Sequence, residues 1–275
     1  MFATRFAPSP TGYLHRGHAL SGLTAFAAAR AAGGRFVLRI EDIDATRCRP
    51  EFEAAIYEDL TWLGLEWETP VRRQSEHLDD YQAALARLEA DGLLYRCFRT
   101  RREVAEAMAS APHGAMEVFR GSALPADEEA RRLAAGEPFA WRLSLDAASR
   151  KLGGFGALTF TEEGEGVVSA RPELGGDVVL ARKDVGVAYH LAVTVDDALQ
   201  GITHVIRGRD LFDATHVQRL LQVLLGLPEP VYRHHRLLTG PDGKRFAKRD
   251  RAETLRSLRE RGMSAADLRK ELGFD

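Results

Sequence analysis

The sequence predicts an α/β protein in which helices cover a parallel sheet. Two short apolar runs near the N-terminus, ATRFAP (residues 3–8) and RFVLRIED (residues 35–42), have the character of strands, and the first ends in a proline-marked turn. Between these runs apolar residues recur at helical spacing, which predicts a helix over residues 17–32.

Two further helices are expected to follow. Pro50 suits the first turn of a helix that ends before Gly64 and carries its apolar residues on one side. A second amphipathic pattern runs from Leu78 to Leu88 and stops near Gly92. This alternation of strands and helices is typical of a parallel sheet covered by helices.

The character of the sequence changes over residues 95–185, which are rich in Arg, Ala, Glu and Gly and contain short alternating runs such as FAWRLSL. We expect an inserted, mixed α/β module there. Strand-like runs return from residue 189, and a helical pattern follows. The predicted organisation is a main domain made of residues 1–94 and 186–235, the inserted module, and a C-terminal part over 236–275 with a basic loop and a helical segment.

Composition excludes several classes of protein. The 275 residues carry a formal net charge of −2, so no strong overall field attracts nucleic acid or a membrane. The N-terminus lacks a signal layout, and no apolar run reaches membrane-spanning length. Cys48 and Cys97 are the only cysteines, too few for a disulfide framework or a thiolate metal site. We expect a cytoplasmic protein with no membrane partner.

The charge is nevertheless unevenly distributed. Between Arg233 and Arg261 the sequence has ten Lys or Arg residues against four acidic ones. Such a patch is a candidate for phosphate recognition, although a solvated surface explains the charge equally well.

The stretch PSPTGYLHRGH (residues 8–18) lies between the first strand and the first helix. In an open parallel sheet, ligands bind beyond the carboxyl ends of the strands, and a helix N-terminus favours phosphate. His15 and His18, three residues apart, would lie on one side of the first helical turn and could donate hydrogen bonds to a triphosphate. The alternative is that each histidine only caps the helix or packs locally.

A second candidate for phosphate chemistry is GPDGKRFAKRD (residues 240–250), where glycines surround four cations. A lysine in this loop could neutralise pyrophosphate as it leaves. Alone, the loop would be interpreted as a solvated basic surface; together with the histidine pair, the functional interpretation is favoured.

Several segments carry a family resemblance. RFAPSPTGYLHRGHA (5–19) resembles the HIGH signature of class I aminoacyl-tRNA synthetases in the form of the glutamate branch, and RFAKR (245–249) is similar to their KMSKS signature. RIEDID (39–44), AYHLAVTVDD (188–197) and HVIRGRDL (204–211) resemble further segments in the same order. The resemblance implies a Rossmann-like nucleotide-binding fold in the main domain, ATP as co-substrate, and Mg²⁺ bound with ATP.

The resemblance also implies roles for individual residues. Arg5 would pair with a carboxylate of glutamate, Ser9 would add a hydrogen bond, and Glu41 would hold the ammonium group. The implied glutamate-binding positions are Arg5, Phe6, Ala7, Pro8, Ser9, Glu41, Tyr189 and Arg207. The implied ATP-binding positions are His15, Gly17, His18 and Lys248, of which the two histidines and the lysine would be catalytic. A solvated acidic loop is the alternative for Glu41 and a surface salt bridge for Arg207, while Asp42 and Asp44 stay undecided.

The length of the chain indicates which branch of the family it resembles. Only 26 residues follow Arg249, so we expect no anticodon-binding domain. This resembles the truncated relatives of glutamyl-tRNA synthetase, which implies that L-glutamate is activated without tRNA and transferred to queuosine at the first anticodon position of tRNA(Asp). The catalytic domain, acting as a monomer, would then bind the anticodon stem-loop. The alternatives are charging of a tRNA 3′ end, nucleotidyl transfer to a small molecule, and non-catalytic amino-acid binding.

Two departures from the family pattern have consequences. Many members bind zinc through C-x-C followed by Y-x₃-C, but here only Cys97 remains of those ligands, and Arg99, Ala115 and Phe119 replace the others. One thiolate cannot make a tetrahedral site, so we predict no zinc and treat the nearby His113 as a loop residue. The second departure is an alanine in place of serine in RFAKR; because the lysine is retained, adenylate chemistry should be as well.

Overall fold

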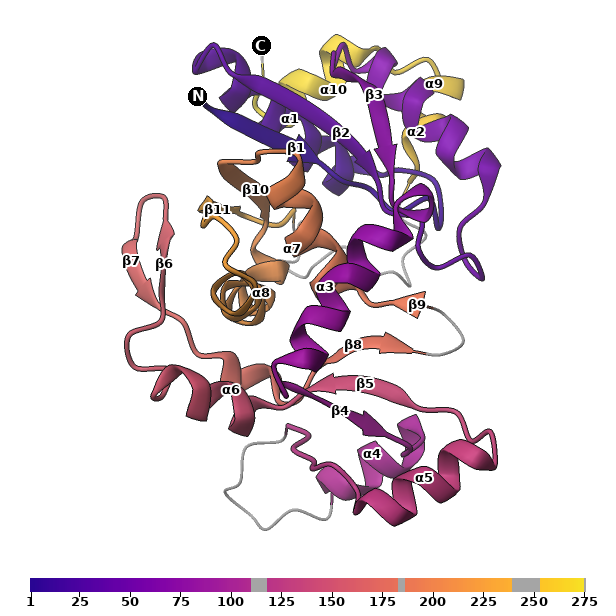
Figure 1. Cartoon of the computed structure of the whole chain (residues 1–275). Helices are drawn as coiled ribbons and strands as arrows, with labels where there is room; N and C mark the ends of the chain where they lie inside the picture. The colour runs from indigo at the N-terminus through magenta and orange to yellow at the C-terminus, as the bar shows by residue number, and fades with distance from the viewer. Residues whose placement is uncertain (110–117, 183–185, 239–252, 275) are drawn as a thin grey trace.

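The computed structural model describes residues 1–109, 118–182, 186–238 and 253–274. Figure 1 shows the N-terminal and C-terminal segments together at one end of the molecule and the segment coloured magenta to pink at the other. Across the described ranges, no helix combines the length and the apolar character needed to cross a membrane.

The chain begins with three parallel strands joined by two helices. In order these are β1 (Ala3–Phe6), α1 (Arg16–Ala31), β2 (Arg35–Ile40), α2 (Pro50–Trp62) and β3 (Glu68–Arg73). β2 lies between β1 and β3 and pairs in parallel with both. The predicted parallel sheet is thus confirmed. β3 was not expected, because its sequence ETPVRR is polar and its first half is exposed.

A second parallel pair completes this sheet. Its elements are α7 (Tyr189–Leu199), β10 (His204–Gly208), η3 (Arg209–Leu211), α8 (Phe212–Leu225) and β11 (Val231–His235). β10 lies beside β1, where the Thr203 N–H donates to the Ala3 carbonyl at 2.9 Å. The strand order is therefore β3-β2-β1-β10-β11, and the winding reverses between β1 and β10. In open α/β sheets such a reversal marks the ligand site.

The segment between these two halves forms an antiparallel sheet with the strand order β4-β5-β8-β9. Figure 1 shows the helices of this segment partly on the side of the antiparallel sheet that faces away from the parallel sheet and partly next to the antiparallel sheet. Its elements are β4 (Leu94–Cys97), α4 (Arg101–Ala109), α5 (Ala126–Ala134), β5 (Ala140–Leu143), α6 (Leu145–Leu152), β8 (Val179–Arg182) and β9 (Gly186–Val187).

One hairpin from the same stretch of sequence joins the parallel sheet instead. It consists of β6 (Thr159–Glu162) and β7 (Gly166–Ser169), and η2 (Pro172–Gly175) follows it. β6 pairs in parallel with β11, where Glu162 lies opposite Tyr232. The edge of the parallel sheet is therefore covered by residues that lie about 70 positions earlier in the chain.

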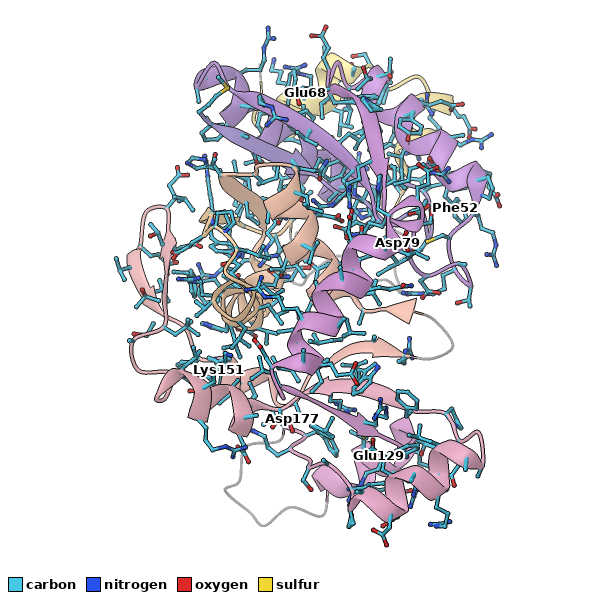
Figure 2. All side chains as sticks on the ribbon, in the orientation of Figure 1. Phe52, Glu68, Asp79, Glu129, Lys151 and Asp177 are labelled. Atoms are coloured by element: carbon cyan, nitrogen blue, oxygen red, sulfur yellow. The ribbon has the colours of Figure 1, made fainter. Side chains whose placement is uncertain are left out.

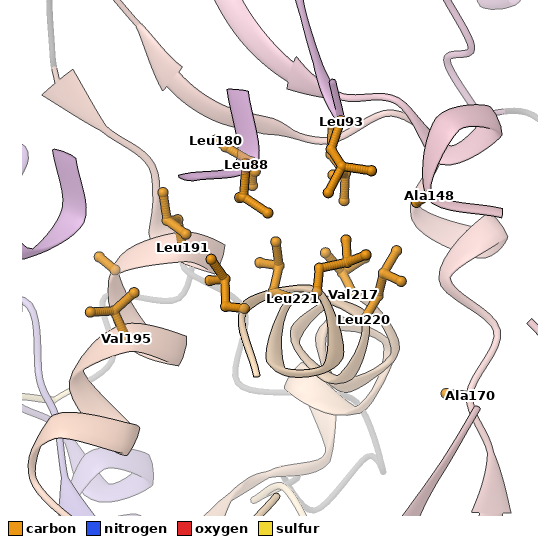
Figure 3. Packing of buried hydrophobic residues seen from close by; sticks show 14 of the residues in the cluster. Leu88, Leu93, Ala148, Ala170, Leu180, Leu191, Val195, Val217, Leu220 and Leu221 are labelled. Carbon is orange, nitrogen blue, oxygen red and sulfur yellow. The ribbon is translucent and has the colours of Figure 1, made fainter. Parts of the chain in front are cut away.

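The two halves share one apolar core. The short turn η1 (Gln74–Glu76) leads into the helix α3 (Leu78–Ala90), which runs from the parallel sheet to β4. Figure 3 shows leucines of α3, α7 and α8 meeting those of the antiparallel sheet, among them Leu88, Leu180, Leu191 and Leu221. Each fully buried leucine contributes roughly 1.5–3 kcal/mol to stability, so this contact holds the halves together.

The C-terminal helices α9 (Leu255–Glu260) and α10 (Ala265–Glu271) pack on α1 and α2. Leu255, Leu258 and Leu268 are buried in the same apolar cluster as Leu23 and Leu60. The end of the described chain is thus built into the N-terminal half of the molecule.

Candidate active site

The candidate site lies where β1, β2 and β10 end at the reversal of winding. Arg5 is in β1, Glu41 directly follows β2, Arg207 is in β10, and Tyr189 is the first residue of α7. Burial raises the pKa of the Tyr189 phenol, while the charges of Arg207 and Arg5 lower it and that of Glu41 raises it further. Arg5 Nη1 donates to the carbonyl of Ile206, the residue before Arg207, at 3.5 Å, so β1 and β10 bring the two predicted arginines to the same place.

A buried ion network holds two of these residues. Arg39, fully buried in β2, donates from Nη1 to Asp197 Oδ1 at 2.7 Å and from Nη2 to Glu41 Oε1 at 3.1 Å. Asp197 Oδ1 also accepts from Arg5 Nε at 3.0 Å. Burial alone would raise the pKa of Asp197, but Arg5 and Arg39 hold it below its ordinary value. One arginine and one aspartate thus fix the positions of Arg5 and Glu41.

Glu41 differs from Asp197 in its electrostatic balance. Burial raises the pKa of the Glu41 carboxyl, and the attraction of Arg39 and Arg5 offsets this only in part. A cationic partner would stabilise the ionised form. Burial of Glu41 thus outweighs the attraction of the two arginines that favour its ionised form.

The neighbouring Asp196 attaches the same helix, α7, to the elements that pack beside it. Its carboxylate accepts from Arg72 Nε and Gln74 Nε2, both at 2.7 Å, and from the Tyr81 hydroxyl at 2.9 Å. These bonds join α7 to β3 and α3. No sequence pattern indicated a role for Arg39, but two adjacent acids in the otherwise apolar α7 are a signal for Asp196 and Asp197.

Arg207 is held separately from Arg5. Its side chain is buried, and it donates from Nε to His234 Nε2 at 3.1 Å and from Nη2 to Thr215 Oγ1 at 2.7 Å. Arg207 pairs with no acidic side chain within the described ranges, so the surface salt bridge considered as its alternative role does not occur there. Among the described residues, the structure gives no partner to its third nitrogen, Nη1.

Two buried polar atoms near Tyr189 also have no partner within the described ranges. They are Nδ1 of His190 and Nε2 of Gln218, of which the second lies just beyond hydrogen-bond geometry from the Tyr189 phenol, whose pKa it still lowers. Burial, with a smaller effect from Arg207, lowers the pKa of His190 to about 4, so this imidazole is neutral at physiological pH. Since buried polar groups are normally hydrogen-bonded, these atoms indicate capacity for a polar ligand.

The two histidines of the HIGH-like motif cap α1 reciprocally. His15, the N-cap residue, accepts from the Gly17 N–H at Nδ1 (3.1 Å), and His18 Nδ1 accepts from the His15 N–H (3.2 Å). Each ring therefore has its proton on Nε2, which makes Nε2 a donor. The rings lie 3.8 Å apart between centroids, and burial lowers the pKa of His15, so it stays neutral.

Gly17 makes this arrangement possible. A side chain there would place Cβ 3.0 Å from Cε1 of the His15 ring, closer than such contacts normally occur. Nδ1 of both rings thus caps the helix, as the alternative considered for the histidines had it, and this places the proton of each ring on Nε2.

The loop after β1 is fastened to the loop after β2. The Pro8 carbonyl accepts from the Glu41 N–H and the Pro10 carbonyl from the Arg49 N–H, both at 3.0 Å. Ser9 is exposed between them, and Ala7 is half-buried. The Phe6 side chain, in contrast, packs in the apolar core, so only its backbone is available to a ligand.

The two undecided acids have structural contacts. Asp42 accepts from the Ser75 N–H at 2.8 Å and from the Ser75 hydroxyl at 2.6 Å. Asp44 accepts from the side chains of Thr46 and Arg47, which lower its pKa to about 2. Through these contacts, both residues stabilise the conformation of the loop after β2.

Lys248, Ala247 and Arg249 lie outside the described residues, as do Ala115 and His113. The residues that follow the basic loop are described and lie at the histidine motif. Thr254 forms an antiparallel bridge with His15, and the Leu255 N–H donates to the Leu14 carbonyl at 2.8 Å.

Of the positions where the family binds zinc, those that the structure describes hold Cys97, Arg99 and Phe119, which offer one metal-binding side chain. Cys97 is buried in a small apolar cluster with Tyr95 and Phe119. The Phe119 ring lies 4.4 Å from the Arg142 guanidinium and 5.9 Å from that of Arg99. Among the described residues no group of three His, Cys, Asp or Glu side chains is placed to hold a metal ion.

The chain belongs to the class I tRNA synthetases for Glu and Gln: the family model of their catalytic domain matches residues 1–272. The expected Rossmann-like synthetase fold is thereby confirmed. The solved glutamate–tRNA synthetase of Elizabethkingia anophelis is similar, with a TM-score of 0.76 and 29% identity over 90% of this chain and 53% of its own.

The branch follows from the curated relatives. The glutamyl-Q tRNA(Asp) synthetase of Rhodobacter capsulatus is 47% identical over 98% of this chain and 99% of its own length. That of Symbiobacterium thermophilum is 43% identical over 96% of this chain and 83% of its own. Glutamate–tRNA ligase 2 of Dinoroseobacter shibae is 40% identical, but this chain spans only 58% of it. The predicted resemblance to the truncated branch is confirmed.

Proposed function

We propose that the protein activates L-glutamate with ATP, without needing tRNA, and transfers the glutamyl group to queuosine at the first anticodon position of tRNA(Asp). The relatives named glutamyl-Q tRNA(Asp) synthetase support this function over nearly the whole chain.

The observation that supports glutamate most directly is the charge pattern of the candidate site. Arg5 and Arg207 provide two guanidinium groups, and Glu41 provides one carboxylate. Glutamate carries the complementary set of two carboxylates and one ammonium group. Glutamine would place a neutral amide where glutamate places a carboxylate, and so would weaken the charge-assisted hydrogen bonds to one of these guanidinium groups.

The chemistry follows from the same groups. A carboxylate oxygen of glutamate attacks the α-phosphorus of ATP, the bond to the β-phosphate oxygen breaks, and pyrophosphate leaves. The Nε2–H groups of His15 and His18 would donate to phosphate oxygens as charge develops, and Lys248 would stabilise the departing pyrophosphate. Mg²⁺ would accompany the ATP phosphates. Queuosine then displaces AMP from the glutamyl adenylate.

We further propose that the protein acts without zinc. In the inserted module, buried Asp177 accepts from the Tyr95 hydroxyl and the Gly121 N–H, both at 2.9 Å, and from the Leu145 N–H at 3.1 Å. Figure 2 shows Asp177 in the half of the molecule that holds the antiparallel sheet. These bonds tie together the segments that a metal would otherwise join.

For tRNA, we propose that a cytoplasmic monomer binds the anticodon stem-loop through its catalytic domain. The basic stretch from Arg233 to Arg261 is a weaker candidate for this contact than its composition suggests. Four of its five described cations pair with acidic groups, and only Arg236 is exposed without such a pair in the described part. Any phosphate contact would rest on Arg236 and on the cations of residues 244–251.

The decisive experiment follows labelled glutamate in the presence of ATP and purified tRNA. We expect label on tRNA(Asp) that contains queuosine and none on tRNA(Asp) that lacks it or on tRNA(Glu). Label at the 3′ end of tRNA(Glu) would instead identify a charging enzyme. Binding of glutamate without glutamate-dependent pyrophosphate exchange would identify a non-catalytic module.

A further inference from the structure

We propose that Glu162, His234 and Thr215 are positioning residues that hold the Arg207 guanidinium in the orientation needed for the amino acid. The proposal rests on the function proposed above, in which Arg207 binds glutamate. It assigns a role in the active site to the β6–β7 hairpin.

The imidazole of His234 has a single possible tautomer. Arg207 Nε always carries a hydrogen, so His234 Nε2, at 3.1 Å, must be the acceptor of this bond. The ring proton is therefore on Nδ1 and is donated to Glu162 Oε2 at 2.8 Å. Burial and the charge of Arg207 lower the pKa of His234 to about 3, so the ring stays neutral and keeps its acceptor.

Glu162 is bound to His234 twice. Its other oxygen, Oε1, accepts from the His234 backbone N–H at 2.7 Å. The side chains of the two residues are 2% and 0% exposed, so water does not compete for these bonds. A carboxylate that accepts hydrogen bonds from both the backbone N–H and the ring N–H of one histidine fixes the plane of the ring. Carboxylates that accept from metal-binding histidines orient those rings in the same way.

The guanidinium is held at a second point by Thr215. Arg207 Nη2 donates to Thr215 Oγ1 at 2.7 Å, and the guanidinium carbon lies 5.6 Å from the centroid of the Tyr232 ring. Two bonds in the guanidinium plane, together with an aromatic ring nearby, define its orientation. Nη1 is then the nitrogen left to meet a carboxylate, since none of the described residues accepts from it.

Glu162 reaches this place only through the sheet. It is the last residue of β6 and lies opposite Tyr232 of β11, two residues before His234. No other element of the described chain places a carboxylate on His234. The hairpin therefore contributes an active-site support although the synthetase signatures lie elsewhere in the sequence.

The test is glutamate-dependent ATP–pyrophosphate exchange by the full-length protein, with KM measured separately for glutamate and ATP. We expect His234→Phe, which fills the space but cannot accept a hydrogen bond, to raise the glutamate KM about tenfold or more. Glu162→Gln and Thr215→Val should raise it by smaller factors, and the ATP KM should stay within about twofold. His234→Gln, which can accept through its amide oxygen, should recover much of the loss.

Matched variants separate the possible failures. Glu165→Gln removes the exposed pair of Glu165 with Arg209 on the same hairpin and should leave both KM values unchanged. An unchanged glutamate KM in Arg207→Ala would overturn the proposed role of Arg207 itself. A raised glutamate KM in Arg207→Ala but not in His234→Phe, Glu162→Gln or Thr215→Val would overturn only the positioning role. Equal changes in both KM values would indicate a merely structural role and would also overturn it. If His234→Phe does not fold, the other two variants decide.

Discussion

At the scale of single residues, the histidine pair combines two functions that are normally separate. Nδ1 of each ring accepts a backbone N–H at the start of α1, as serine and glutamate do in a capping box. The ring proton is thereby on Nε2, which is a donor with a fixed direction. The capping geometry and the proposed phosphate contact are therefore compatible within one side chain.

Because His15 caps the helix with Nδ1 and is proposed to contact phosphate with Nε2, a suitable substitution should remove the second role and keep the first. Asparagine is a good N-cap residue but lacks a donor at the position of Nε2, so His15→Asn should keep the stability within about 0.5 kcal/mol of the wild type. Its exchange rate should fall about 10²-fold, the effect of losing one transition-state donor. Thermal unfolding and pyrophosphate exchange provide the two readouts.

The control is His15→Ala, which removes the cap as well and should cost about 1 kcal/mol of stability. Normal exchange by His15→Asn would mean that the imidazole only caps the helix.

At the scale of elements, the C-terminal helices are attached to α2 through a buried ion pair. Arg259 Nη2 of α9 lies 2.9 Å from Asp59 Oδ1, and the Asp59 side chain is fully buried. Burial raises the pKa of Asp59 to about 6, although Arg259 opposes the shift. Leu255 and Leu258 add apolar contacts from the same helix.

The raised pKa gives the attachment a definite pH dependence. Asp59 is more easily ionised in the unfolded chain, so its contribution to stability is largest below its unfolded pKa and is lost as the pH rises through about 6. Arg259→Ala removes the opposing charge and raises this pKa further. We expect it to lower the free energy of unfolding by roughly 1–3 kcal/mol at pH 8 and by less at pH 5.

Denaturant titrations of wild type and Arg259→Ala at the two pH values would measure this difference. In an Asp59→Asn background, the effect of Arg259→Ala should lose its pH dependence. Equal destabilisation at pH 5 and pH 8 in the otherwise wild-type chain would contradict the explanation.

At the scale of the whole molecule, one apolar core joins the antiparallel sheet to the parallel sheet. Within the half that holds the antiparallel sheet, the hydrogen bonds of buried Asp177 add to stability. An amide at this position would turn a nitrogen toward donors that now meet an oxygen. Asp177→Asn should therefore lower the free energy of unfolding by roughly 1–3 kcal/mol.

A chelator distinguishes this stabilisation from that of a metal. We expect the melting temperature of the wild type to be the same with and without chelator, and lower for Asp177→Asn in both conditions. A fall in the melting temperature on chelation, or one equivalent of zinc found by metal analysis, would refute the proposed zinc-free module.

Much of this molecule follows from local patterns in the sequence. The periodicity of residues 17–32, the apolar runs that form β1 and β2, and the proline that opens α2 each encode an element through interactions between near neighbours. The synthetase signatures similarly located Arg5, Glu41, Tyr189 and Arg207, which the fold then brings together.

The supporting groups could not be predicted in this way. β3 is polar because it lies at an edge of its sheet, and the pairing of β6 with β11 joins residues about 70 positions apart. In the sequence, Arg39, Asp197 and Glu162 look like ordinary charged surface residues. Only the tertiary structure shows that each is buried beside a partner and holds other side chains in place. Periodicity reports which face of an element is apolar, whereas pairing between distant segments depends on the free energy of the assembled chain. For that reason the sequence identifies the groups proposed to meet the substrate, and the tertiary structure identifies the groups that hold them in place.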